Sequence, residues 1–308
     1  MGIRFGLIGA GRMGRVFANT LAYSVAEADL VAVADPEAAT LDEVSARYGI
    51  PTRYTDYHEL LAQKDIEAVV VASPTGTHAE VITAAAQAGK QIFSEKPLSQ
   101  DLKACDLALT AVKKAGVKLQ MGFMRRYDAP YAAAKQKILE GVIGQPVMFK
   151  ATSRDPKRTS LEFARREHSG GMIMDMGVHD FDLARWLMSS EVTRVFSEGA
   201  CLAFPELKDV GDIDNAVINL RFATDAIGNI DMSRNAVYGY DIRTEVLGTD
   251  GSLWIGYLQQ TPTLVLTRGG VIHDTVPYFM ERFGAAYAEE VRVFTRHIVN
   301  DTAPEVTG

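Results

Sequence analysis

A glycine-rich turn near the start of the chain has the spacing of a dinucleotide-binding loop. Gly9, Gly11 and Gly14 follow an apolar run directly and begin a helical pattern. In such a loop the first glycine permits a tight turn, the second lets the backbone approach a pyrophosphate, and the third allows close helix packing. Free N–H groups at the helix start then face the phosphate charge. Arg12 and Met13 lie inside this predicted cofactor-binding loop.

The acidic residue expected of such a site is present. Asp35 ends the second predicted strand, 21 residues after Gly14. A carboxylate there binds the ribose hydroxyls and repels a 2′-phosphate, so the sequence predicts NAD rather than NADP. The neighbouring Pro36 cannot hold such a phosphate. The alternative is a glycine turn and a strand-end aspartate without a ligand.

The turn after the next predicted core strand, residues 68–72, is expected to line the same cofactor site. Ligands in open α/β sheets bind beyond the carboxyl ends of the strands. We therefore assign Ser73, Pro74, Thr75 and His78 to cofactor binding. Simple turn, cap and helix-start roles remain the alternative for each of them.

Lys96 follows another predicted strand and is a candidate catalytic and substrate-binding residue. An ammonium group here can donate a hydrogen bond to a substrate hydroxyl and stabilise a developing oxyanion. Glu95, just before it, is assigned to the cofactor site. The alternative is an exposed Lys–Glu pair without a catalytic role.

Asp175 and His179 lie four residues apart in a predicted helix, so they share one face. A histidine oriented by a carboxylate can act as a general base. Alcohol oxidation needs such a base, because the hydroxyl proton must leave as the hydride does. A buried core histidine is the alternative. No metal is expected, because the histidines are scattered and the cysteines do not form a ligand pattern.

The first 120 residues alternate short apolar runs with amphipathic segments, which predicts βαβ units and a parallel sheet buried on both faces. The predicted strands are residues 3–8, 30–34, 68–72, 91–94 and 118–121. The predicted helices are residues 13–21, 38–48, 78–88 and 102–115.

The pattern changes after Gly122. Helices are predicted near residues 130–140, 172–188 and 283–299, and a strand near 147–153. Residues 192–267 are mostly strand with an apolar side chain at every second position, which indicates a large, mainly antiparallel open sheet. Its other face is either solvated or packed on another subunit. The predicted domains are therefore residues 1–122, which bind NAD, and 123–308, which bind substrate and form oligomers.

Composition narrows the class of protein. With 308 residues, 47% of them hydrophobic, and a net charge of −7, the chain is expected to be a two-domain globular protein. Neither nucleic acid nor membrane is an expected partner. No run of about 18 apolar residues occurs and the N-terminus does not resemble a signal peptide. Cys105 and Cys201 are expected to be buried, reduced thiols, which favours the cytoplasm.

Taken together, these motifs resemble the GFO/IDH/MocA oxidoreductases over nearly the whole chain. The glycine turn, Glu95-Lys96-Pro97, the turn at residues 141–146 and the Asp-x-Gly-x-His-Asp motif at 175–180 occur in the family's order. The resemblance implies a Rossmann domain followed by a C-terminal α/β domain whose open sheet often forms dimers or tetramers. It also implies a further helical segment beyond Gly308.

Within this family the chain is most similar to the inositol 2-dehydrogenase branch, through residues 122–128, 153–156 and 179–186. The resemblance implies catalytic roles for Lys96, Asp175 and His179. It adds substrate-binding candidates, and these are Arg126, Asp155 and Tyr238. The expected reaction is NAD-dependent oxidation of a cyclic polyol, from myo-inositol to 2-keto-myo-inositol.

Two other functions remain open at this point. A sugar dehydrogenase or reductase of the same family would use the same residues, because hydride transfer is reversible. A dinucleotide-sensing regulatory protein would use the glycine turn without catalysis. The set Lys96, Asp175 and His179 separates an enzyme from a sensor, because a sensor has no need of these three residues.

Overall fold

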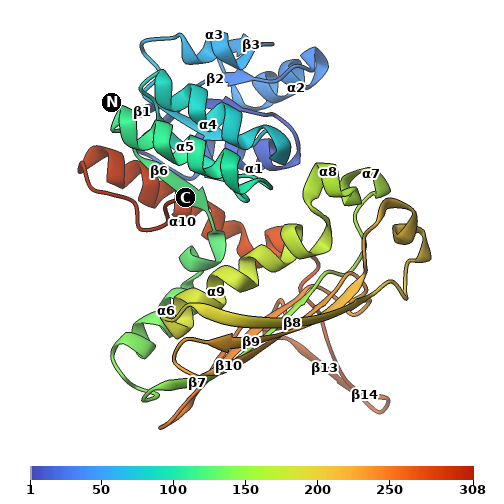
Figure 1. The fold of residues 1–308 in the computed structure, drawn as a ribbon. Helices are drawn as coiled ribbons and strands as arrows, with labels where there is room; N and C mark the ends of the chain where they lie inside the picture. Colours follow the sequence, from blue (N-terminus) through green and yellow to red (C-terminus); the bar gives the residue numbers. More distant parts are fainter. Residues whose placement is uncertain (1) are drawn as a thin grey trace. The chain divides into compact units, whose positions relative to one another are not determined.

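The apolar runs of the first 120 residues form one parallel sheet in the computed structural model, which describes residues 2–308. Its strand order is β3-β2-β1-β4-β5-β6, the order of a doubly wound dinucleotide-binding fold (Figure 1). This confirms the predicted Rossmann architecture. The strands are β1 (Ile3–Ile8), β2 (Ala28–Ala34), β3 (Thr52–Tyr54), β4 (Ala68–Val71), β5 (Gln91–Glu95) and β6 (Leu119–Gly122).

The helices between these strands follow the predicted order. They are α1 (Arg12–Tyr23), α2 (Ala38–Tyr48), α3 (Tyr57–Leu61), α4 (His78–Gln87) and α5 (Leu102–Ala115). Strand β3 and helix α3 were not predicted, because elements of three and five residues are too short to show a period. His78 is the first residue of α4, in agreement with its predicted helix-start position.

The chain divides into two compact units, and one of them combines two separate segments of the sequence. One unit contains residues up to Met124 together with Ala286–Gly308, and the other is Arg125–Ala285. Helix α10 (Phe279–Val299) therefore begins in the second unit and ends in the first. Residues 286–308 are predicted from sequence to lie in the second domain, whereas their contacts group them with the first unit.

The reason is the buried side of α10, which packs on the parallel sheet. The ring of Phe294 lies 6.3 Å from that of Phe5 in β1 and 6.0 Å from that of Phe93 in β5. Tyr287, two turns earlier, lies 6.0 Å from Phe17 in α1. Helices α1 and α10 thus share an aromatic core with one face of the sheet.

The second unit is built on a six-stranded mixed sheet with the order β12-β11-β7-β10-β9-β8. Only β7 and β10 pair in parallel, so the prediction of a mainly antiparallel sheet is confirmed. A separate hairpin of β13 and β14 follows. The strands are β7 (Pro146–Arg154), β8 (Val192–Ala200), β9 (Asn215–Phe222), β10 (Ile227–Ser233), β11 (Asp241–Gly248), β12 (Ser252–Ile255), β13 (Leu264–Thr267) and β14 (Gly270–His273).

One face of this mixed sheet is covered by helices and the other is open. Figure 1 shows α6 (Ala129–Leu139) and α9 (Val178–Met188) along the covered face. In β9 the buried Ile218 and Leu220 alternate with the exposed Val217, as predicted. Two short helices, α7 (Leu161–Ala164) and α8 (Arg166–Ser169), lie between β7 and α9 in the sequence.

The two cysteines are free thiols, and only one fits the prediction fully. Cys201 is buried, whereas Cys105 is half-buried because it lies on the amphipathic helix α5, which buries little of its surface. Among residues 2–308, no helix is long and apolar enough to cross a bilayer.

Candidate functional site

The glycine turn between β1 and α1 is shaped by close backbone contact. A Cβ atom on Gly9 would lie 2.5 Å from the carbonyl oxygen of Ala72, and one on Gly14 would lie 2.0 Å from the oxygen of Gly9. Gly9 also has a positive φ of 94°, which favours glycine. A Cβ on Gly11 would meet nothing within 4 Å. The first and third glycines are therefore required by packing, and the second borders open space.

Helix α1 begins at this open space without a capping side chain. Gly11 is the N-cap and makes no side-chain hydrogen bond, and the first turn holds no acidic residue. The N–H groups of a helix start carry partial positive charge and bind phosphate oxygens well. Arg12 is exposed beside them and Met13 is half-buried. This geometry fits a pyrophosphate.

Asp35 is held next to the same turn. Its Oδ2 accepts a hydrogen bond from the backbone N–H of Ala10 at 2.7 Å, and its Oδ1 accepts one from Glu37 at 3.0 Å. Each carboxylate oxygen can accept more than one hydrogen bond. The half-buried carboxylate therefore keeps acceptor capacity for ribose hydroxyls while its orientation is fixed by the backbone.

His78 connects the ends of β4 and β5. Its Nε2 lies 2.8 Å from the carbonyl oxygen of Ser73, and its Nδ1 lies 2.8 Å from that of Pro97. Burial lowers the pKa of His78, the two carbonyls oppose that shift, and the charge of Lys96 adds to it. Both ring nitrogens thus contact main-chain oxygens, and the ring ties the two strand ends together. Pro74 is exposed, and Thr75 is half-buried at the start of a short 3₁₀ turn.

Glu95 and Lys96 are not an exposed pair. Glu95 is buried at the end of β5, and its Oε2 accepts the backbone N–H of Lys96 at 3.0 Å. Lys96 is half-buried, and its peptide bond to Pro97 is cis. The first unit therefore brings every predicted cofactor residue, together with Lys96, to one edge of its sheet, at the carboxyl ends of β1, β2, β4 and β5.

In the second unit, Asp175 and His179 lie at the start of the helical segment that ends with α9. Asp175 is in a single π-helical turn, Ile173–Gly177, and His179 is the second residue of α9. The sequence predicted an uninterrupted α-helix here. π-Helical turns inside helices are frequently found at functional sites.

A buried arginine that was not predicted as a site residue lies beside Asp175. Arg234 is 1% exposed, and its Nη2 lies 3.4 Å from Asp175 Oδ2 and 3.8 Å from Asp212 Oδ2. Asp212 in turn accepts the backbone N–H of Met172 at 2.8 Å. Arg234 thus places a positive charge next to the carboxylate predicted to orient His179. The sequence signal that could have identified Arg234 as a site residue was its position directly after a strand, β10.

The substrate candidate Arg126 pairs with a carboxylate of α9. Its Nε and Nη2 donate to the two oxygens of Asp182, at 2.8 and 2.6 Å, and its guanidinium lies over the ring of Trp186. The adjacent Arg125 pairs with the buried Asp180 at 2.6 Å. Burial raises the pKa of Asp180, and the charge of Arg125 opposes that shift.

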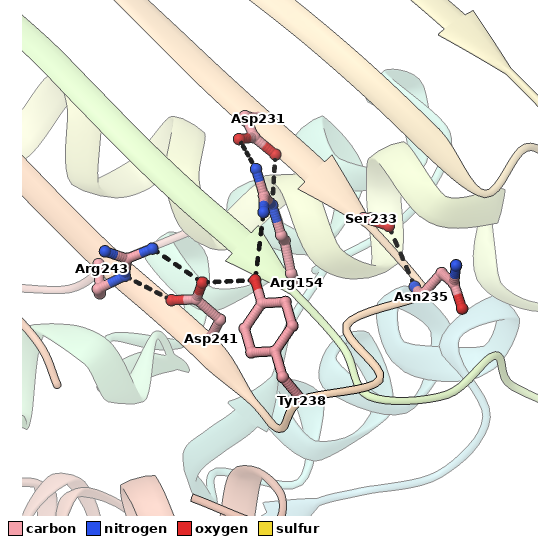
Figure 2. A network of polar contacts seen from close by, with 7 residues as sticks. All are labelled: Arg154, Asp231, Ser233, Asn235, Tyr238, Asp241 and Arg243. Carbon is pink, nitrogen blue, oxygen red and sulfur yellow. Dashed lines mark hydrogen bonds and ion pairs between the residues drawn. The ribbon is translucent and has the colours of Figure 1, made fainter. Parts of the chain in front are cut away.

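Tyr238 belongs to a polar network at the ends of β7, β10 and β11 (Figure 2). Its hydroxyl donates to Asp241 Oδ2 at 2.8 Å and accepts from Arg154 Nη1 at 3.2 Å. Arg154 also forms two hydrogen bonds with Asp231, and Arg243 forms two with Asp241. Burial and the bond to Asp241 raise the pKa of Tyr238.

Asp155 and Asn235 lie near the loop that carries Arg234. The backbone N–H of Asp155 donates to the oxygen of Ser233, and the oxygen of Asp155 accepts from Ala236, both at 2.8 Å. Figure 2 shows Asn235 at the turn after β10, where its backbone N–H donates to the Ser233 hydroxyl at 3.1 Å. The second unit therefore brings the backbone of Asp155 next to the segment that holds Asp175 in place.

Two family models match the chain. Residues 3–123 match an oxidoreductase family with an NAD-binding Rossmann fold, and residues 131–254 match the GFO/IDH/MocA C-terminal domain. The predictions of an oxidoreductase and of NAD as cofactor are thereby confirmed. The open space at Gly11, the uncapped start of α1 and the fixed carboxylate of Asp35 fit that dinucleotide.

Curated relatives align over nearly the whole chain. The scyllo-inositol 2-dehydrogenase (NAD⁺) of Bacillus subtilis is 40% identical over 99% of this chain and 89% of its own length. The myo-inositol 2-dehydrogenase of Thermotoga maritima is 40% identical over 99% of this chain and 91% of its own. The structure of Lactobacillus casei scyllo-inositol dehydrogenase with NAD(H) and scyllo-inositol is similar with a TM-score of 0.95. That protein is 32% identical, and the match covers 100% of this chain and 92% of that one.

Replacing Asp35 tests the cofactor site. In Asp35→Ser, the ribose hydroxyls lose a charged acceptor, which is worth about 1.5–3 kcal/mol, or roughly a tenfold to hundredfold weaker affinity for NAD. Affinity for NADP should rise, because the repulsion of the 2′-phosphate is removed. Calorimetric titration with both cofactors measures this, and Asp42→Ser, a change at an exposed acid on α2, serves as the control. An unchanged NAD/NADP ratio in Asp35→Ser would contradict the assignment.

Proposed function

The chain belongs to the GFO/IDH/MocA family of oxidoreductases, and from this premise we propose that it oxidises a secondary hydroxyl of a cyclic polyol with NAD. The proposed reaction converts myo-inositol to 2-keto-myo-inositol. The observation that carries the proposal is the 40% identity, over 99% of this chain, to two relatives named as inositol 2-dehydrogenases. The match to oxidoreductases favours an enzyme over a dinucleotide sensor.

The proposed residue roles follow from their chemistry. NAD, when bound, supplies the hydride acceptor. We assign the glycine turn and Asp35 to holding the cofactor, within a domain of residues 1–122. Lys96 donates a hydrogen bond to the reacting hydroxyl and stabilises negative charge on its oxygen. His179 accepts the hydroxyl proton as general base.

Asp175 is the proposed orienting carboxylate for His179, and Arg234 supports it. The guanidinium of Arg234 lies 3.4 Å from Asp175 Oδ2 and restricts where this carboxylate can lie. An ionised carboxylate stabilises the imidazolium that forms when His179 takes a proton. Arg234 and Asp212 are therefore proposed to determine where that negative charge lies.

A polyol offers several hydroxyls, so its site requires polar groups that the wrong epimer would leave unpaired. We propose that Asp155 contributes to that site, because its backbone is bonded to the loop of Arg234. Arg126 and Tyr238 remain weaker candidates, since Asp182 engages two nitrogens of Arg126 and the network of Figure 2 engages the hydroxyl of Tyr238. Substrate binding is proposed for residues 123–308.

A steady-state kinetic screen tests the proposed reaction. Myo-, scyllo- and chiro-inositol are compared with aldoses, each with NAD and with NADP, by following NADH absorbance. We expect the highest kcat/KM with an inositol and NAD. Activity on aldoses alone would replace the cyclitol with a sugar, and absence of turnover with all substrates, while NAD still binds, would support a sensor.

Separate substitutions of Lys96 and His179 test the catalytic roles. Lys96→Met and His179→Ala should each lower kcat by about 10²- to 10⁴-fold, because a positioned proton-transfer or oxyanion-stabilising group is lost. The Kd for NAD, measured by calorimetry, should stay at its wild-type value. Lys103→Met, a change at an exposed lysine on α5, is the matched control. Full turnover in either active-site variant would refute the role given to that residue.

We also propose that a second copy of the chain packs on the open face of the mixed sheet, giving a homodimer or homotetramer. Trp254 in β12 is 81% exposed and Phe196 in β8 is 61% exposed, and Val217, Ile227 and Leu247 are exposed between them. Large exposed apolar patches mark interaction surfaces. The free thiols are compatible with the proposed cytoplasmic location.

Trp254→Asp tests this surface, because it places a charge in any apolar contact that includes the exposed indole of β12. Wild type should sediment as a dimer or larger, and the variant as a smaller species at the same concentration. Leu102→Asp is the matched control, since Leu102 on α5 is also 81% exposed. Analytical ultracentrifugation distinguishes the species, and an assembly that survives in Trp254→Asp would contradict the proposed interface.

A further inference from the structure

Strand β8 forms one edge of the mixed sheet (Figure 1) and, among residues 2–308, pairs with β9 and with no other strand. It is nine residues long, and every residue from Thr193 to Gly199 is exposed. The strand at the opposite edge, β12, has only four residues. The N–H and C=O groups along a free edge can pair with a strand of another chain. A long free edge such as β8 therefore needs either protection or a partner.

The features that usually protect a free edge are weak in β8. The strand contains neither proline nor lysine. Its register against β9 is irregular only between Val192 and Arg194, at the start of the strand. Val195 is 59% exposed and Phe196 is 61% exposed, so apolar side chains are exposed on both faces of the strand. A long, regular and partly apolar edge of this kind favours pairing with another strand.

Two opposite charges flank Phe196 on one face of the strand. Arg194, Phe196 and Glu198 point the same way, because alternate side chains of a strand share a face. This is the open face of the sheet, since Arg194 and Phe196 border a depression there together with Asn219. Within residues 2–308, the side chains of Arg194 and Glu198 form no ion pair and no hydrogen bond. Both charges are therefore available to a partner.

Antiparallel pairing of β8 with β8 of a second copy would place these side chains in complementary order. With a two-fold axis at Phe196, this ring lies opposite the partner's Phe196, and Arg194 lies opposite the partner's Glu198. By symmetry Glu198 meets the partner's Arg194. Directly opposed side chains have Cβ atoms about 4.5–5.5 Å apart, within reach of ion pairs and ring contacts. Both ion pairs thus form in the same register as the aromatic contact.

No neighbouring register offers the same match. Moving the axis by one residue shifts the pairing by two, and it places Arg194 opposite either the partner's Phe196 or the partner's Ala200. Both ion pairs are lost in either case. The order of charges along β8 therefore specifies one antiparallel register, which is the way that side-chain patterns usually fix strand pairing.

We propose that the β8 edge is an interface between two copies of this chain, paired antiparallel around a two-fold axis at Phe196. The two mixed sheets then form one continuous sheet. The axis of such a pair is perpendicular to the sheet, whereas the axis of the open-face contact proposed above is parallel to it. The two contacts can therefore occur in one assembly, and together they give a closed tetramer.

Charge reversal tests the pairing by analytical ultracentrifugation. Arg194→Glu alone, or Glu198→Arg alone, places like charges opposite each other at two points and should weaken association by about 10- to 100-fold. Combining the two changes restores opposite charges with their order exchanged, so the double variant should associate with the wild-type Kd. Lys113→Glu, at an exposed lysine on α5, is the control and should leave association unchanged.

A cross-link tests the position of the axis. Only a residue on a two-fold axis lies opposite its own copy, so Phe196→Cys should form a disulfide-linked dimer under mild oxidation. Ser197→Cys faces the partner's Val195 instead and should form none. Both variants carry Cys105→Ser, because Cys105 is the partly exposed native thiol.

The possible outcomes separate this interface from the other proposals. A monomeric wild type, unchanged association in both single charge reversals, or a double variant as weak as the single ones would overturn it. Equal cross-linking of Phe196→Cys and Ser197→Cys would overturn the register. Trp254→Asp should leave a dimer held by β8, and a monomer in that variant would show that the edge alone does not join two copies. None of these measurements uses substrate, so failure of the proposed reaction leaves them decisive.

Discussion

The close approach of Gly9 to the backbone of Ala72 and Ser73 is the constraint on which the cofactor site depends. The turn after β1 meets the end of β4 with no room for a side chain, so the two strand ends form one rigid edge. From that edge, one backbone N–H reaches Asp35 and one carbonyl reaches His78. Main-chain groups, which cannot be exchanged by substitution, thus hold the side chains that would contact a dinucleotide.

The second unit positions its side chains by charge rather than by backbone contact. Three acids, Asp175, Asp180 and Asp182, lie in or next to α9, and each faces an arginine. Buried ion pairs add little net stability, but loss of one partner leaves the other charge buried and unpaired. The helical segment of Asp175 and α9 is therefore restricted to arrangements that keep its pairs with Arg125, Arg126 and Arg234.

The glycine turn, Asp35, Lys96 and the alternation in β9 could be predicted from sequence, because each is a local pattern with a local cause. The π-helical turn at Asp175 could not be predicted, since the spacing of residues in this segment does not distinguish a π-helical turn from an α-helix. Arg234 was missed for another reason. Its partners, Asp175 and Asp212, are distant from it in the sequence, so only tertiary structure shows that this charged side chain is buried.

The course of α10 has a consequence for how the chain is made. The Rossmann sheet requires residues 286–308 for its completion: Phe294 covers Phe5 and Phe93, and the backbone N–H of Met121 at the edge strand donates to Val306. On the ribosome, the first half of the chain emerges long before these residues do. The aromatic face of the sheet therefore stays uncovered until the second unit, Arg125–Ala285, has been synthesised. Exposed apolar surface and unpaired strand edges make incompletely folded chains prone to aggregation, so this interval is the vulnerable stage of synthesis.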